Sequence, residues 1–143
     1  MSEVHKPVAS TEQTLKYLFG NYKCKTEVLE MFDANGSRYE FEVREPTIGQ
    51  AQEISNRSFD TIGEKQVYNR TAQEFECLLA LVYYPKTNTP VFERAQYESY
   101  TNLPVSAPIR ILGALAIAFY VGVANIDEKK LSGKTEKNSS SST

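Results

Sequence analysis

The apolar run near the end of the sequence is the feature that most limits how this chain can fold. From Ile111 to Ala124 every residue is apolar, aromatic or glycine. The run is shorter than the roughly 20 residues that span a bilayer, so we expect a helix buried in protein and no membrane anchor. Ser106 can cap this helix and Pro108 fits its first turn, which together predict a helix over about residues 107–123.

A helix that is apolar on nearly every side is either central in its own domain or shared with another chain. The sequence leaves both interpretations open. In the second, part of the helix and nearby tyrosines contact a second copy or a partner, because aromatic residues are enriched in protein interfaces. The candidate partner-binding residues are Leu115, Phe119, Tyr120, Tyr97 and Tyr100.

An N-terminal β-hairpin is predicted before this helix. The stretch RYEFEVR, residues 38–44, alternates charged and apolar residues, which is typical of a strand with one wet face and one buried face. Residues 25–32 can form the first strand, and Asp33 to Gly36 supplies residues that suit a hairpin loop. Two strands alone are marginal in water, so helices must cover the apolar face.

The first covering helix should begin where the second strand ends. Pro46 cannot donate to the strand ladder, and Thr47 with Gln50 forms a capping-box pattern. We expect a helix over residues 48–59, followed by a turn from Asp60 to Gly63. Its inward residues should be Ile48, Ala51, Ile54 and Phe59.

Two further helices are expected before the apolar run. A second capping box at Thr71 to Glu74 predicts a helix that ends before Pro85. The spacing places its apolar residues on one core-facing stripe: Phe75, Leu78, Leu79 and Val82. A short helix is predicted over residues 92–100.

The fold class is therefore α+β: an N-terminal β-hairpin packed against a bundle of three to four helices, mainly helical. The 143 residues, 41% hydrophobic and 24% charged, are the material of one soluble domain. We expect a flexible N-terminal arm over residues 1–24, a single domain over 25–124, and a disordered, charged and serine-rich tail over 125–143.

The composition indicates little catalytic chemistry. The net charge of −2 does not suit a nucleic-acid partner, since binding phosphates needs a broad positive field. The only histidine, His5, lies in the expected arm, and Cys24 and Cys77 have no spacing typical of zinc sites. Glu40 and Glu42 share one side of the strand with arginines, which is typical of a solvent-exposed face. We expect no enzyme activity, no cofactor, no metal and no signal peptide.

The order of these segments resembles the tail assembly chaperones of long-tailed bacteriophages. The similarity spans residues 25–122 and is one of pattern more than of a single motif. The stretches that carry it are VREPTIGQAQEI, EFECLLALVYYP, NTPVFERAQYESYTNLP and ILGALAIAFYVG.

The resemblance implies a chaperone that binds the tape measure protein, keeps it soluble and delivers it to the tail tube protein. It also implies self-association, a location in the host cytoplasm and absence from the mature virion. The alternative interpretation is a structural virion component, either a minor tail protein or a head-tail joining protein. A third is an enzyme or nucleic-acid regulator of a kind that composition does not reveal.

Overall fold

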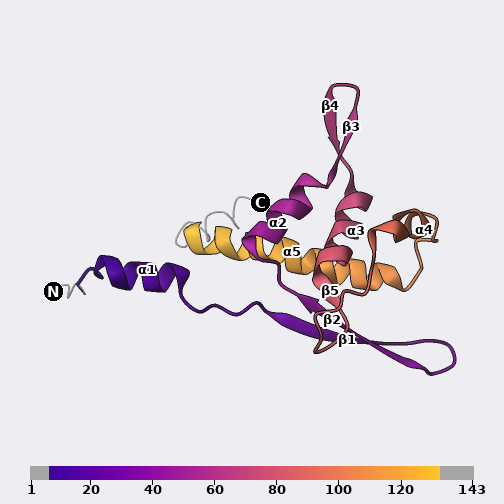
Figure 1. The fold of residues 1–143 in the computed structure, drawn as a ribbon, viewed down its shortest axis with the longest axis horizontal. Coiled ribbons are helices and arrows are strands. Elements are labelled where there is room, and N and C mark those ends of the chain that lie inside the picture. Colours follow the sequence, from indigo (N-terminus) through magenta and orange to yellow (C-terminus); the bar gives the residue numbers. More distant parts are fainter. Residues whose placement is uncertain (1–6, 133–143) are drawn as a thin grey trace, which may run out of the picture.

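The computed structural model describes residues 7–132, with side chains described as far as residue 122. The fold contains helices and strands and belongs to the predicted α+β class (Figure 1). The strands are β1 (Thr26–Phe32), β2 (Arg38–Arg44), β3 (Phe59–Ile62), β4 (Lys65–Tyr68) and β5 (Val82–Tyr83). The helices are α1 (Thr11–Phe19), α2 (Ile48–Asn56), α3 (Arg70–Leu81), α4 (Tyr97–Thr101) and α5 (Ile109–Ser132), with a 3-10 turn, η1, at Arg94–Gln96.

Strands β1 and β2 form an antiparallel hairpin, and β5 extends it to a three-stranded sheet in the order β1-β2-β5. Asp33 closes the hairpin loop, because its Oδ1 accepts hydrogen bonds from the amides of Asn35 and Ser37. Gly36 takes a φ of +83°, which a glycine adopts without strain. On the outer face Arg38 pairs with Glu30 at 3.0 Å, in keeping with the predicted wet side.

The capping box predicted at the start of α2 is present. The Gln50 amide donates to the Thr47 hydroxyl at 3.1 Å, and the Thr47 amide donates to the Gln50 side chain at 3.0 Å. Ile54 is buried as expected, but Ile48 is 90% exposed, so its predicted inward position is wrong. The two residues are six apart, which places them on different sides of a helix with 3.6 residues per turn.

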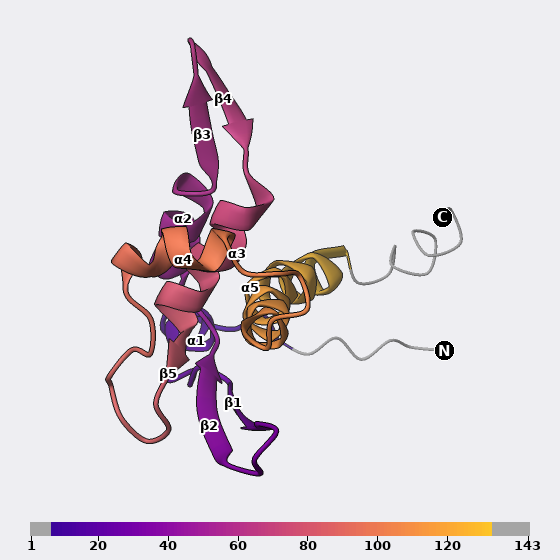
Figure 2. The same cartoon turned by 90° about the vertical axis from the view of Figure 1, so that its right-hand side faces the viewer.

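A second hairpin replaces the predicted end of α2 and the turn after it. The helix ends at Asn56, and β3 and β4 then pair across a loop in which Gly63 has a φ of +65°. Phe59 is not inward: it is 44% exposed and packs edge-on against Tyr68. This pair of strands, residues 59–68, stands out from the body of the molecule and is called the projecting hairpin below (Figures 1 and 2).

Helix α3 is capped by Asn69, and the predicted capping box at Thr71 is wrong. The Ala72 amide donates to Asn69 Oδ1 at 3.0 Å, so Thr71 already lies inside the helix. The helix ends at Leu81 because Val82, which was expected on its core stripe, pairs with Val43 of β2 as part of β5.

The described core joins β2, β5, α2, α3, α4 and α5. Its most buried hydrophobic residues are Val43, Ile54, Phe75, Cys77, Leu78, Leu81, Val82, Tyr100, Leu112 and Ala116. The predicted helix at 92–100 is divided into η1 and the short α4. The core therefore draws on segments from both halves of the chain.

Parts of the expected arm and tail are helical. Helix α1, capped by Ser10, lies within the predicted arm; none of its residues is buried, and it is set apart from the other elements in Figure 1. Helix α5 continues to Ser132, so the expected boundary at residues 124 and 125 falls inside a helix. Residues 1–6 of the arm and 133–143 of the tail lie outside the described residues.

Candidate partner-binding surface

Helix α5 turns one side to the core and leaves an apolar stripe on the other. Leu112 and Ala116 are 2% and 0% exposed, and they face α3 and the sheet. The exposed stripe follows the opposite side at spacings of three or four residues, which aligns side chains along a helix. We call it the α5 stripe; it consists of Ile111, Ala114, Ala118 and Val121.

Three of the five candidate residues from the sequence lie on α5 and two lie on α4, and none belongs to the stripe. Tyr100 is 6% exposed, with its ring centroid 5.2 Å from that of Phe75, so it is a core residue and we leave it out of the surface. The other four candidates are half-buried and pack against the core: Leu115, Phe119, Tyr120 and Tyr97. Of these, Leu115 directly borders the stripe, one turn from Ile111.

The sequence therefore predicts the helix but not which of its large residues are most exposed. Ile111 is 57% exposed and Val121 is 39% exposed. Their spacing with Ala114 and Ala118 was visible in the sequence, but so was an apolar residue on every other side. Only the packing of α3 distinguishes the stripe from the buried side.

A buried carboxylate on α3 pairs with an arginine at the start of α5. Glu74 is 8% exposed, and its Oε1 lies 3.0 Å from Arg110 Nε. Gly113 allows this close approach, because a Cβ at that position would come within 2.9 Å of the Glu74 side chain. These contacts set the rotation of α5, and with it the direction in which the stripe faces.

A second ion pair holds the segment that leads to α4. Arg94 donates to both carboxylate oxygens of Glu76, at 2.5 and 3.0 Å, and Glu76 is 9% exposed. These hydrogen bonds raise the pKa of Arg94. A bidentate pair of this kind orients both partners as well as joining them.

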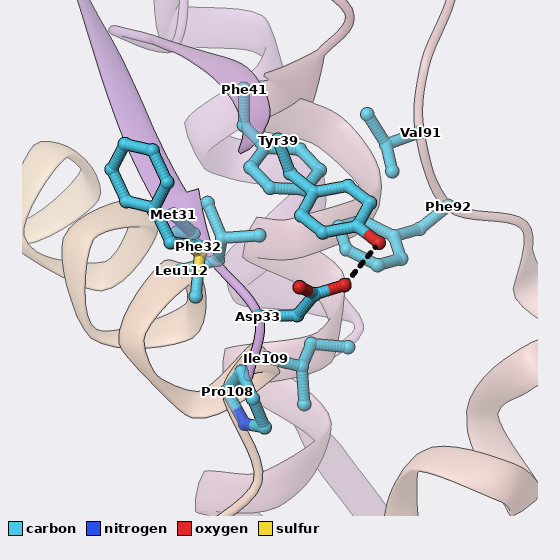
Figure 3. A pocket seen from close by; sticks show the side chains of 10 residues that line it. All are labelled: Met31, Phe32, Asp33, Tyr39, Phe41, Val91, Phe92, Pro108, Ile109 and Leu112. Atoms are coloured by element: carbon cyan, nitrogen blue, oxygen red, sulfur yellow. Dashed lines mark hydrogen bonds between the residues drawn. The ribbon is translucent and has the colours of Figure 1, made fainter. Parts of the chain in front are cut away.

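An apolar cavity of about 340 Å³ lies between the β1-β2 hairpin and the start of α5 (Figure 3). Its walls include Met31, Phe41, Val91, Phe92, Ile109 and Leu112. The Asp33 carboxylate also lines it, and Asp33 Oδ2 accepts a hydrogen bond from the Tyr39 hydroxyl at 2.9 Å. We call this space the hairpin cavity. Its volume falls in the range of ~300–1,000 Å³ that is common for binding pockets.

Asp33 gives the hairpin cavity a negative charge. The Ser37 amide, followed by the Tyr39 hydroxyl, donates to the carboxylate and lowers the pKa of Asp33 below its usual value. The same hydrogen bond raises the pKa of Tyr39. At neutral pH the cavity thus presents apolar walls and one ionised carboxylate.

The groups that could carry covalent or metal chemistry are separated from one another. Burial raises the pKa of the Cys77 thiol to about 12, with the nearby Glu74 and Glu76 adding to the effect. Cys24 is exposed. Among the side chains that the structure describes, residues 7–122, no group of three or more His, Cys, Asp or Glu could hold a metal ion. His5 lies outside the described part of the chain.

None of the helices in the described part of the chain has the length and apolar character needed to cross a membrane. No family model, curated protein or solved structure matches the sequence or the fold.

Proposed function

We propose that this protein is a chaperone that binds an apolar helical segment of a longer chain along the α5 stripe and keeps that chain soluble. The observation that carries the proposal is the position of the stripe: Ile111 and Val121 are exposed on a helix whose other side is anchored in the core. Contiguous exposed apolar surface on a soluble protein is typical of an interaction site.

The composition of the stripe favours a helical partner. Its middle positions are Ala114 and Ala118, whose small side chains let a second helix approach closely. The larger Ile111 and Val121 flank them and can fit between the side chains of a facing helix. Helices packed in this way lie about 8–10 Å apart.

In this proposal the N-terminal hairpin and the helices packed against it form the scaffold that holds α5 in place. The resemblance to tail assembly chaperones supports the tape measure protein as the partner and the tail tube protein as its recipient. It also supports action in the host cytoplasm, without a cofactor or a covalent step, and absence from the finished virion.

Co-expression with the tape measure protein tests the proposal. The wild-type chain should raise the soluble yield of the tape measure protein and co-purify with it. Ala118→Asp places a charge in the middle of the stripe and should abolish both effects, because the partner helix would have to bury an unpaired carboxylate.

The matched control is Ile48→Asp, which places the same charge on α2 at a residue that is 90% exposed and lies outside the stripe. This variant should raise the soluble yield of the tape measure protein as much as the wild type does. Equal rescue by Ala118→Asp and Ile48→Asp would overturn the proposed surface. Detection of the protein by mass spectrometry in purified virions would instead support the structural virion component.

A further inference from the structure

Helix α1 exposes an apolar face that nothing in the described part of the chain covers. Leu15, Leu18 and Phe19 are 51%, 58% and 81% exposed, and their spacing of three and four residues places them on one side of the helix. We call these three residues the α1 stripe. A helix of nine residues is only marginally stable in water by itself, so a surface that covered this stripe would stabilise α1.

A short link joins α1 to the rest of the fold. Lys25, just before β1, is held in place because its amide donates to Glu45 Oε1 at 3.0 Å. Residues 20–24 form the link and contain no helix or strand. Five residues reach up to ~17 Å when extended, which exceeds the ~10 Å diameter of a helix. The link is therefore long enough to carry α1 around a neighbouring helix.

The neighbouring helix at this point is α5. Val43 of β2 pairs with Glu27, two residues after Lys25, and belongs to the same core cluster as Ala116 of α5. From there α5 continues towards the end of the molecule at which α1 lies (Figure 1). The α5 stripe therefore lies where the link can bring α1.

The two stripes match in length and in character. Ile111 and Val121 are ten residues apart and span ~15 Å, while the nine residues of α1 span ~14 Å. Residues 111–122 include no charged side chain, so this surface favours an apolar face as its partner. The small side chains of Ala114 and Ala118 leave space for the larger side chains of the α1 stripe.

We propose that α1 folds back onto the α5 stripe of its own chain when no partner is bound, and that a partner helix displaces it. The inference rests on the proposed function, because it describes how the partner-binding surface is covered before a partner arrives. The structure shows the open arrangement, with α1 set apart from α5 (Figure 1).

The covalent link favours α1 over a separate molecule as the occupant of the free stripe. A short flexible link gives α1 an effective concentration in the millimolar range, which dilution of the protein does not lower. The exposed side of α5 holds one helix at a time, so α1 and the partner compete for it. Docked α1 thus keeps the α5 stripe away from other apolar surfaces.

Hydrogen exchange of the full-length chain, measured by NMR without a partner, tests the contact. The amides of residues 15–19 should exchange about tenfold more slowly in the wild type than in Leu18→Asp, because the charge prevents docking. Tyr17→Asp is the matched control, since it places the same charge on the opposite side of α1 at a residue that is 74% exposed. It should keep the wild-type protection. Ala118→Asp should also remove the protection of α1, because it alters the surface on which α1 docks.

A dye that binds exposed apolar surface, anilinonaphthalene sulfonate, reports the α5 side of the contact. Its fluorescence should be higher with Leu18→Asp than with the wild type or Tyr17→Asp, because the α5 stripe is uncovered. Adding Ala118→Asp to Leu18→Asp should remove this gain. Circular dichroism checks that every variant is folded, and no residue of α1 is buried in the domain.

Co-expression with the tape measure protein distinguishes this inference from the proposed function. Leu18→Asp should raise the soluble yield at least as much as the wild type does, because α1 no longer competes with the partner. A lower yield would mean that α1 helps to hold the partner, and would overturn the proposal. Slow exchange of α1 in a wild type that fails to raise the yield would support the docking of α1 while the proposed function fails.

Two results in the absence of a partner would also overturn the proposal. The first is a wild type in which the amides of α1 exchange as fast as those of Leu18→Asp. The second is protection of α1 that persists in Ala118→Asp, which would mean that α1 docks at another surface. In either case the solubility test of Ala118→Asp against Ile48→Asp would still decide the proposed function.

Discussion

Arg110 Nε lies 3.0 Å from Glu74 Oε1, which ties the start of α5 to a carboxylate that is 8% exposed on α3. Removing Arg110 would leave the Glu74 carboxylate buried without a cation beside it. The orientation of α5, and hence the surface that it presents, depends on this contact and on the space around it.

Gly113→Ala should destabilise the fold by ~1–3 kcal/mol, the usual cost of overpacking. The new Cβ would come within 2.9 Å of the Glu74 side chain, and moving Glu74 disturbs its ion pair with Arg110. Gly122→Ala is the matched control, because it lies in the same helix with nothing within 4 Å of the added Cβ. It should stabilise the fold by ~0.5–1 kcal/mol. Urea denaturation measures both changes, and equal effects would contradict this account of Gly113.

Tyr100→Phe should raise the free energy of unfolding by about 1 kcal/mol. The Tyr100 hydroxyl is buried and has no hydrogen-bond partner among the described residues, while its ring packs on Phe75. The substitution removes the unpaired hydroxyl and keeps the ring. Thermal unfolding measures the difference, and a loss of stability would indicate that the hydroxyl does have a partner.

Asp33 should contribute to stability at neutral pH and lose that contribution in acid. Its folded pKa is lowered, so the stabilisation is fully present above the unfolded pKa of about 3.9 and disappears as the pH falls through the folded pKa. Asp33→Asn removes the titrating group. The stability gap between wild type and Asp33→Asn, measured in urea at several pH values, should narrow below about pH 4. A gap that stays constant across this range would contradict the prediction.

One thiol of the described pair should react in the folded protein. Cys24 is exposed, whereas Cys77 is buried and its pKa is raised to about 12, so Cys77 holds little of the reactive thiolate. An aromatic disulfide reagent should label Cys24 within minutes and Cys77 only after unfolding. The variant Cys24→Ser should then show no fast labelling; a fast phase that remained would place Cys77 within reach of solvent.

Phe119→Asp should unfold or strongly destabilise the domain, by at least ~2 kcal/mol, because Phe119 packs against the core. Ala118→Asp, at the neighbouring exposed position, should cost no more than ~1 kcal/mol, near the difference in helix propensity. Comparing the two melting temperatures tests which side of α5 is buried. If Phe119→Asp melted at a higher temperature than Ala118→Asp, the assignment of the exposed stripe would be wrong.

Local signals predicted well the parts of the fold that local chemistry determines. The capping box of Thr47 and Gln50, the loop after β1 and the burial of Ile54 all follow from residues close together in the sequence. The β5 strand gives no such signal, because its two residues become a strand only by pairing with β2, far away along the chain. The projecting hairpin was missed because its short strands alternate weakly and follow a helix pattern directly.

The candidate surface was likewise predictable from the sequence only in part. An apolar helix near the end of the chain was evident from composition, and so was its potential for contact with another chain. The exposed side could not be predicted, because residues such as Leu112 and Ile111 look alike in sequence. Their difference arises from the packing of α5 against α3, which brings two distant segments together.

The core has a consequence for how the protein is made. Leu112 and Ala116, from the last described helix, complete a core that Val43 and Leu78 begin much earlier in the chain. While α5 is still inside the ribosome, the apolar side chains of those earlier residues remain exposed to water. Cooperative folding must therefore wait until Leu112 and Ala116 have left the ribosome.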